Sequence, residues 1–299
     1  MKILKILLTH FIIFSYTSSY ACELELESNI FIISKTTNSS DLKTIIKKTN
    51  CTDTINQQVL KTICQHHGKI ASEQINFYAN GSESGNIHIN PGNIEIYNFE
   101  KFAKKSLELD DFYVFQDTKT IDHINAYSIN SIEDLQMECS NCDHPGPKTI
   151  KVSFKEQPSN EVKNIWIKTN LLIRTKALVS NSSLPPFEGN LDSKFNEKYV
   201  NSMQPETLFI DQENLKFYKL NRSLGLGQPL TRNILTPKKL VNYGDTIEVI
   251  FEKYNMKINL QVMARQSGKL GDKISLFNPK SKKMFTGKIV DFKKVMVDI

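Results

Sequence analysis

Cysteines with nearby histidines are the residues of this chain whose spacing could support chemistry. Cys139 and Cys142 are separated by two residues, and His144 follows them. Such a pair can form a local disulfide, a redox-active dithiol or half of a zinc site. A redox pair normally opens a helix, but Pro145-Gly146-Pro147 would break one here. Zinc would need a second ligand pair, for which His66-His67 is the only candidate. We therefore favour a disulfide between Cys139 and Cys142, with a zinc site or a redox dithiol as the alternatives.

Two glycine-bearing segments approach known catalytic or nucleotide-binding motifs without completing them. The segment 81–85 carries Glu83 where a nucleophile elbow requires serine. The segment 225–230 lacks the third glycine of a dinucleotide-binding loop, and Pro229 removes a backbone donor that a phosphate could use. The sequence therefore predicts no catalytic residue, no cofactor and no resident metal, and we expect that the protein is not an enzyme.

The N-terminus has the parts of a secretory signal peptide. Lys2 and Lys5 precede the apolar run 6–14, and the small-residue exit Ser19-Tyr20-Ala21 leads to Cys22. The apolar run is shorter than the roughly 20 residues that a membrane-spanning helix needs. We expect Sec-dependent export to the periplasm, cleavage of residues 1–21 between Ala21 and Cys22, and no membrane span.

Lipid attachment at Cys22 is the alternative to ordinary cleavage. Lipidation sites normally carry leucine three residues before the cysteine, where this chain has Ser19, so ordinary cleavage is preferred. Cleavage would remove Lys2 and Lys5 and lower the formal charge from +6 to +4. No basic cluster is interleaved with aromatic residues, so we expect no nucleic-acid partner.

The N-terminal part, residues 22–148, has the mixed periodicity of a small α/β domain. Ser40-Asp41 and Thr52-Asp53 read as helix caps, each followed by apolar residues at helical spacing. Cys51 and Cys64 would then lie at opposite ends of the second helix, on the order of 15 Å or more apart, and each should pair with some other cysteine. Alternating residues on both sides of Asn90-Pro91-Gly92-Asn93 predict a hairpin, 98–109 a helix and 112–115 a strand.

From Thr149 onward the pattern is that of a chain built almost wholly from strands. Ile247, Val249 and Phe251 should face the segment 256–262 across a turn at 253–255. A glycine, a turn-forming polar residue, a spacer and an aliphatic residue recur as a local signature. Its occurrences are Gly227-Gln228-Pro229-Leu230, Gly244-Asp245-Thr246-Ile247 and Gly271-Asp272-Lys273-Ile274. Taken singly these are ordinary turns of a β domain.

The order of these signatures resembles a known family. Successive stretches of the chain resemble the C-terminal half of the flagellar basal-body P-ring formation family, FlgA. They are Leu220 to Leu235, Val241 to Val249, Val262 to Ile274, Phe277 to Lys283, and the closing strands around Gly287 and Val295. The likeness covers roughly residues 165–299, and Arg174 to Val200 resembles the start of a SAF domain, a small β-clip fold. Pro185-Pro186-Phe187-Glu188 and Lys282 depart from the family pattern.

The resemblance implies a periplasmic chaperone that binds P-ring subunits before they polymerise, with no catalytic residue. We expect an α+β protein with a mixed domain 22–148 containing short helices, a SAF-like domain 165–235 and a small C-terminal β domain 236–299. Gly225, Leu226, Gly227, Pro229 and Leu230 are the predicted partner-binding residues, in a groove between the last two domains. The alternatives are a pilus-type secretion-assembly SAF protein and a periplasmic glycan-binding module. An enzyme with an accessory SAF unit would need a catalytic domain for which this chain has no room.

Overall fold

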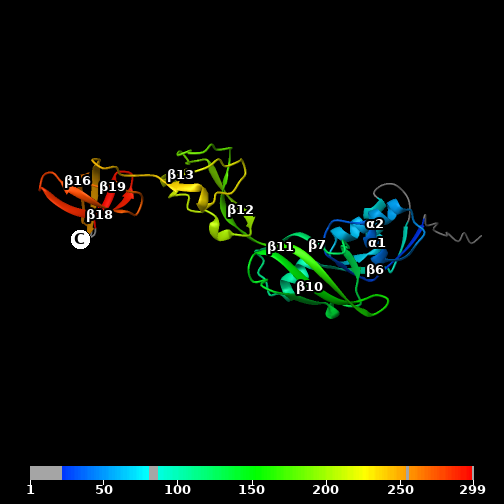
Figure 1. Cartoon of the computed structure of the whole chain (residues 1–299). Coiled ribbons are helices and arrows are strands. Elements are labelled where there is room, and N and C mark those ends of the chain that lie inside the picture. Colours follow the sequence, from blue (N-terminus) through cyan, green and yellow to red (C-terminus); the bar gives the residue numbers. More distant parts are fainter. Residues whose placement is uncertain (1–21, 81–86, 254–255, 298–299) are drawn as a thin grey trace, which may run out of the picture. The chain divides into compact units, whose positions relative to one another are not determined.

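The computed structural model describes residues 22–80, 87–253 and 256–297 (Figure 1). The predicted signal peptide, residues 1–21, and the segment 81–85 lie outside these ranges. The chain forms two compact units, one ending at Leu172 and the other beginning at Ile173. Helices are confined to the first unit apart from short 3₁₀ turns, and strands dominate the second, so the expected α+β class is confirmed. Among the described residues, no helix has the length and hydropathy to span a bilayer.

The first unit begins with two small sheets covered by helices. One has the strand order β3-β1-β5 and the other the order β4-β6-β2-β8. The strands are β1 Cys22–Leu26, β2 Asn29–Ile32, β3 Ile46–Thr49, β4 Gly68–Ala71, β5 Ile87–Asn90, β6 Asn93–Asn98 and β8 Ala126–Ser128. The helices are α1 Ser39–Ile45, α2 Asp53–Gln65, α3 Ser72–Asn80 and α4 Phe99–Ser106. Apolar side chains of α1 to α3 and of both sheets share one core. Strands β2 and β8 also bury side chains of their opposite face, Phe31 and Tyr127, in a second cluster.

The helix predictions are confirmed, with caps that explain where the helices begin. Thr52 precedes α2, and its hydroxyl accepts a hydrogen bond from the amide of Ile55. Asn98 precedes α4 and caps the amides of Glu100 and Lys101. The first helix begins one residue before the predicted cap, after Asn38, and strand β3 follows it directly.

The predicted hairpin around Asn90-Pro91-Gly92-Asn93 is wrong. Strands β5 and β6 both exist, but β5 pairs in parallel with β1, and β6 pairs with β2 and β4. The two strands therefore enter different sheets. Alternation identified each strand from its own residues, whereas the choice of partner depends on strands far away in the sequence.

A second layer of the first unit is a larger antiparallel sheet with its own core. Its strands are β7 Tyr113–Thr120, β9 Gln136–Cys139, β10 Gly146–Glu156 and the first part of β11 Glu161–Ser180. β10 pairs with β9 on one side and with residues 161–171 of β11 on the other. Ile150, Val152 and Phe154 alternate inward and are fully or almost fully buried. A 3₁₀ turn, η1 Ile132–Asp134, precedes β9.

Strand β11 continues into the second unit, where its last part pairs with β12 Phe195–Ser202. A short pair of strands, β13 Tyr218–Leu220 and β14 Leu235–Pro237, follows. The 3₁₀ turns are η2 Pro205–Thr207, η3 Leu215–Phe217 and η4 Arg232–Ile234. Leucine, isoleucine and phenylalanine side chains from these segments form a single cluster, which includes Leu178, Leu184, Phe195, Leu224 and Leu230.

The last strands of the second unit close into a barrel. They are β15 Thr246–Lys253, β16 Met256–Ala264, β17 Lys273–Asn278, β18 Lys283–Asp291 and β19 Lys294–Val297. The predicted antiparallel pairing across 253–255 is confirmed, and β19 closes the barrel by pairing in parallel with β15. The barrel core includes Val249, Val262 and Val295, and Phe217 from η3 joins it. The division of residues 165–299 at position 235 stays a prediction.

Candidate partner-binding surface

The predicted partner-binding segment 225–230 is a tight turn held by its own polar groups. The Gly225 amide donates to Oε1 of Gln228 at 3.0 Å, and the Gln228 amide donates to the Gly225 carbonyl at 3.3 Å. Gly227 has a φ of +74°, a backbone conformation that favours glycine. The turn therefore needs this glycine for its shape.

The end of strand β11 fixes this turn to the second unit. The Ser180 hydroxyl donates to the Gly225 carbonyl and accepts from the Gln228 amide at 3.2 Å. The Gly227 amide donates to the Ser180 carbonyl at 3.0 Å, and Pro229 forms an isolated bridge with Val179. Ser180 is buried and holds the turn through both its backbone and its side chain. Sequence reasoning missed Ser180, because a serine at a strand end carries no distinctive local pattern.

The turn presents one apolar side chain to solvent. Leu226, at its tip, is 69% exposed. Leu230 is 0% exposed and belongs to the core beside Leu178 and Leu184. The glycines and Pro229 contribute backbone shape, so only Leu226 has an apolar side chain placed to contact a partner without rearrangement of the core.

Other exposed apolar side chains of the second unit come from loops and from the edge of the sheet. In residues 173–235 these are Phe187, Tyr199, Met203, Ile210 and Leu226. Lysine or arginine lies near two of the rings: the Lys219 ammonium is 5.9 Å from the Phe187 ring centroid, and the Arg174 guanidinium is 5.4 Å from that of Tyr199. Exposed rings beside cations are common in protein-binding surfaces.

Strand β12 carries the charged groups nearest to Tyr199. Glu197 forms an ion pair with Lys176 of β11 at 2.6 Å. This carboxylate raises the pKa of the Lys176 ammonium through a hydrogen bond and its charge. Both side chains are more than half exposed, so the pair contributes little to stability.

The barrel contacts the rest of the second unit at η3, away from the turn 225–230. Lys216 forms an ion pair with Asp291 at 3.3 Å, and the Phe217 and Phe292 ring centroids are 5.7 Å apart. The Lys238 ammonium donates to the carbonyls of Gly189 and Lys216, each at 2.6 Å. Burial lowers the pKa of Lys238. Outside the turn itself, the hydrogen bonds and bridges of residues 225–230 in the described chain reach residues 178–180 and Phe209, so the predicted groove beside the barrel stays a prediction.

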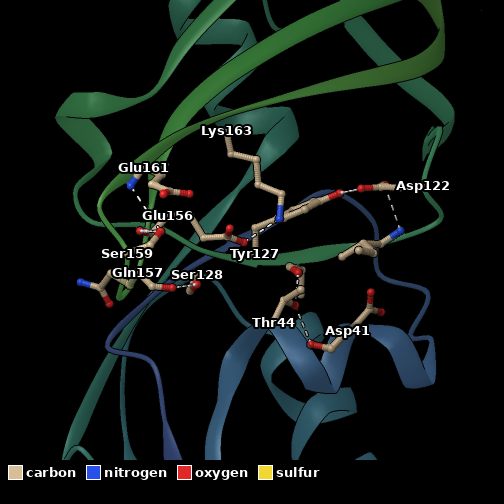
Figure 2. A network of polar contacts seen from close by, with 12 residues as sticks. Asp41, Thr44, Asp122, Tyr127, Ser128, Glu156, Gln157, Ser159, Glu161 and Lys163 are labelled. Carbon is tan, nitrogen blue, oxygen red and sulfur yellow. Dashed lines mark hydrogen bonds and ion pairs between the residues drawn. The ribbon is translucent and has the colours of Figure 1, made fainter.

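The first unit contains a dense polar network, shown in Figure 2. The Tyr127 hydroxyl donates to the Asp122 carboxylate at 2.8 Å, and the Lys163 ammonium lies 5.1 Å from the Tyr127 ring centroid. Lys163 also pairs with Glu156 at 2.6 Å. Burial acts to raise the pKa of Asp122, but hydrogen bonds, first among them that from Tyr127, lower it overall.

These groups are arranged for structure. The Tyr127 side chain is 0% exposed, and burial together with the Asp122 hydrogen bond raises its pKa far above its ordinary value. The Ser128 hydroxyl donates to the Gln157 carbonyl at 3.0 Å, which ties β8 to the loop after β10. The Lys163 ammonium of β11 over the Tyr127 ring connects β8 to the larger sheet as well.

The cysteines form two disulfides, Cys22–Cys51 and Cys139–Cys142, which confirms the expected oxidation. The expectation that Cys64 would also pair is wrong: Cys64 is a free, buried thiol on the core face of α2. The other four of the five cysteines form the two disulfides, so no cysteine is left to pair with Cys64. Over the described ranges, no cluster of His, Cys, Asp or Glu could hold a metal ion.

Residues 161–297 match the family model described as chaperone for flagella basal body P-ring formation. Over these residues, which make up less than half of the chain, the sequence is similar to this family. The matched region contains β11, β12, the turn 225–230 and the barrel. The family expected from the sequence is thus confirmed.

Solved structures of FlgA show similarity at low identity. Salmonella FlgA in its open form is 13% identical, with 67% of this chain and 90% of that chain covered and a TM-score of 0.35. The flagellar protein FlgA from Thermotoga maritima MSB8 is 13% identical, with 93% and 99% covered and a TM-score of 0.38. No curated protein shows significant similarity to the chain.

Proposed function

We propose that this protein is a periplasmic chaperone that binds subunits of the flagellar P ring and keeps them from polymerising before they reach the basal body. The observation that carries the proposal is the family match over residues 161–297. Apolar side chains exposed on the second unit, among them Leu226 and Phe187, supply the surface that such binding requires.

The periplasmic part of the proposal is supported by the disulfides. Disulfides persist in oxidising compartments and are rare where thiols are kept reduced. The Sγ atom of Cys22 is bonded to Cys51, and lipid attachment would need that same sulfur atom. We therefore propose a protein released by cleavage after Ala21, with no lipid anchor.

The proposed action is binding without catalysis. Asp122 and Tyr127, two polar groups of the first unit with shifted pKa values, are hydrogen-bonded to each other. The surface of the second unit instead offers backbone and apolar groups. We propose no substrate, no cofactor and no nucleic-acid partner.

The direct test is binding of the purified mature chain to purified P-ring subunit, measured by calorimetry. We expect one-to-one binding, and Leu226→Asp should weaken it because a charge would replace an exposed apolar contact. Lys269→Asp, which changes an exposed residue between β16 and β17, is the control. Absence of binding by the unaltered chain, together with complete basal bodies in cells lacking the protein, would reject the proposal.

A further inference from the structure

Strand β12 leaves one of its edges unpaired. On one side it pairs with residues 173–180 of β11. On the other side, no strand or loop of the described chain pairs with it. The end of β11 differs, because its second edge is covered by the turn: the Ser180 amide donates to Gln228, and the Leu230 amide donates to Leu178.

The hydrogen-bond phase shows which peptide groups face outward. In an antiparallel pair, the N–H and C=O of one residue point to the same side, and the side alternates along the strand. The Asn181 amide donates to the Lys194 carbonyl at 3.0 Å, so Lys194 faces β11. The alternation continues without a shift of register. The peptide groups of Glu197, Tyr199 and Asn201 therefore point to the free edge.

This edge has only one of the features that usually close an exposed strand, namely charged side chains. Natural proteins protect edges with proline, bulges, very short strands or charged side chains. β12 has eight residues, no proline and no bulge. Its charged residues are Glu197 and Lys198, and the Glu197 carboxylate is already paired with Lys176. β12 therefore has no proline ring or bulge of its own that would obstruct an added strand.

We propose that β12 binds an extended segment of the P-ring subunit by strand addition. The segment would form hydrogen bonds with the backbone of Glu197, Tyr199 and Asn201, over about 13 Å of strand at roughly 3.3 Å per residue. The inference rests on the proposed function. The subunit is the occupant to which we commit, because the matched region that contains β12 is similar to chaperones for P-ring formation.

Side chains beside this edge define what the segment should carry. The Tyr199 ring is 61% exposed and lies against the Arg174 guanidinium. A strand added to β12 would place alternate side chains on the same face as Tyr199. Apolar or acidic residues at those positions fit a surface made of an exposed ring and an arginine.

Substitution of Tyr199 by proline or by alanine distinguishes the contribution of the backbone to binding from that of the side chain. Tyr199→Pro removes an outward N–H and adds a ring on the free edge, and proline is tolerated in edge strands at such positions. We expect at least about tenfold weaker binding of purified P-ring subunit to the full mature chain, because donors in the added ladder are lost and the approach is blocked. Tyr199→Ala, the matched control, should weaken binding far less. Circular dichroism and thermal melting verify that both variants are folded.

Residue-resolved hydrogen exchange tests the same inference without any substitution. In the free protein the amides of Glu197, Tyr199 and Asn201 should exchange quickly, whereas those of Asn196, Lys198 and Val200 should be protected by β11. Bound P-ring subunit should slow the first set at least about tenfold, since each outward amide gains an acceptor.

The outcomes separate the inference from the proposed function. No binding by the unaltered chain rejects the function. Binding that survives Tyr199→Pro in a folded variant, with outward amides still exchanging quickly in the complex, rejects strand addition and leaves the function intact. A dimer of the free chain that Tyr199→Pro converts to a monomer would show that a second copy occupies the edge, and would also overturn the inference.

Discussion

Asp41 is a carboxylate that water does not reach. Its side chain is 0% exposed and accepts backbone hydrogen bonds from Asn38 at 2.7 Å and Asn125 at 2.6 Å. Burial raises its pKa more than these hydrogen bonds lower it. The residue thus secures the start of α1 at an electrostatic cost that the neutral acid would not have.

The pH dependence of stability follows from this direction. A carboxyl group whose pKa is higher in the folded state binds its proton more tightly there, so stability falls as pH rises from the ordinary value of 3.8 through the folded pKa. Unfolding of the unaltered chain and of Asp41→Asn, measured over that range, should show the unaltered chain gaining stability relative to the variant on acidification. If the stability of the two proteins changed equally with pH over this range, the prediction would be contradicted.

Cys64 should be unreactive while the chain is folded. Burial, with a smaller effect from the charge of Asp41, raises the pKa of its thiol to about 12, and only the thiolate reacts with disulfide reagents. At pH 8 the native protein should show no rapidly reacting thiol, and the unreduced protein in denaturant should show one. Rapid reaction of a thiol in the native protein would mean that Cys64 is exposed. Absence of any reactive thiol in denaturant would mean that Cys64 is in a disulfide.

At the scale of the elements, strand existence was predictable and strand partners were not. Alternation located β5, β6 and β15 to β19 because each strand buries one face. The predicted β5–β6 hairpin is wrong because β5 pairs with β1 and β6 pairs with β2, and both partner strands are distant in the sequence. The turn 225–230 was predicted from its glycines, but its anchor Ser180 and the free edge of β12 depend on long-range pairing that no local pattern records.

Strand β18 depends on a glycine for close packing inside the barrel. A Cβ built at Gly287 would lie 2.3 Å from Cγ1 of Val295 and 2.9 Å from Cγ2 of Val297. Gly287→Ala should therefore destabilise the barrel by about 1–3 kcal/mol through overpacking. Chemical denaturation measures this effect. Gly189→Ala in the same unit, where the nearest atom is Cε of Lys238 at 3.7 Å, should change stability much less.

At the scale of the whole molecule, the contacts between the barrel and the preceding segment decide how the second unit behaves. Phe217 belongs to η3 but is buried in the barrel core, and Tyr218 packs against both clusters of this unit. The boundary at 235–236 stays a prediction, and Phe217 on its N-terminal side joins the barrel core. No local sequence pattern indicates this long-range contact.

Phe217→Ala should loosen the barrel even though the residue lies outside its strands. Loss of a buried phenylalanine typically costs about 3–5 kcal/mol. Hydrogen exchange at Val249, Val262 and Val295 should accelerate accordingly. Phe187→Ala, which removes a side chain that is 71% exposed, is the control and should leave these amides unchanged. Equal exchange in both variants would show that Phe217 contributes nothing to the barrel.

Parallel pairing of β15 with β19 also sets the order in which the second unit can mature. Before Lys294–Val297 has been added, β15 and β18 each have an edge without its partner strand, and such edges can associate with other chains. Truncation of the chain before β19 would leave the edges of β15 and β18 unpaired and prone to aggregation.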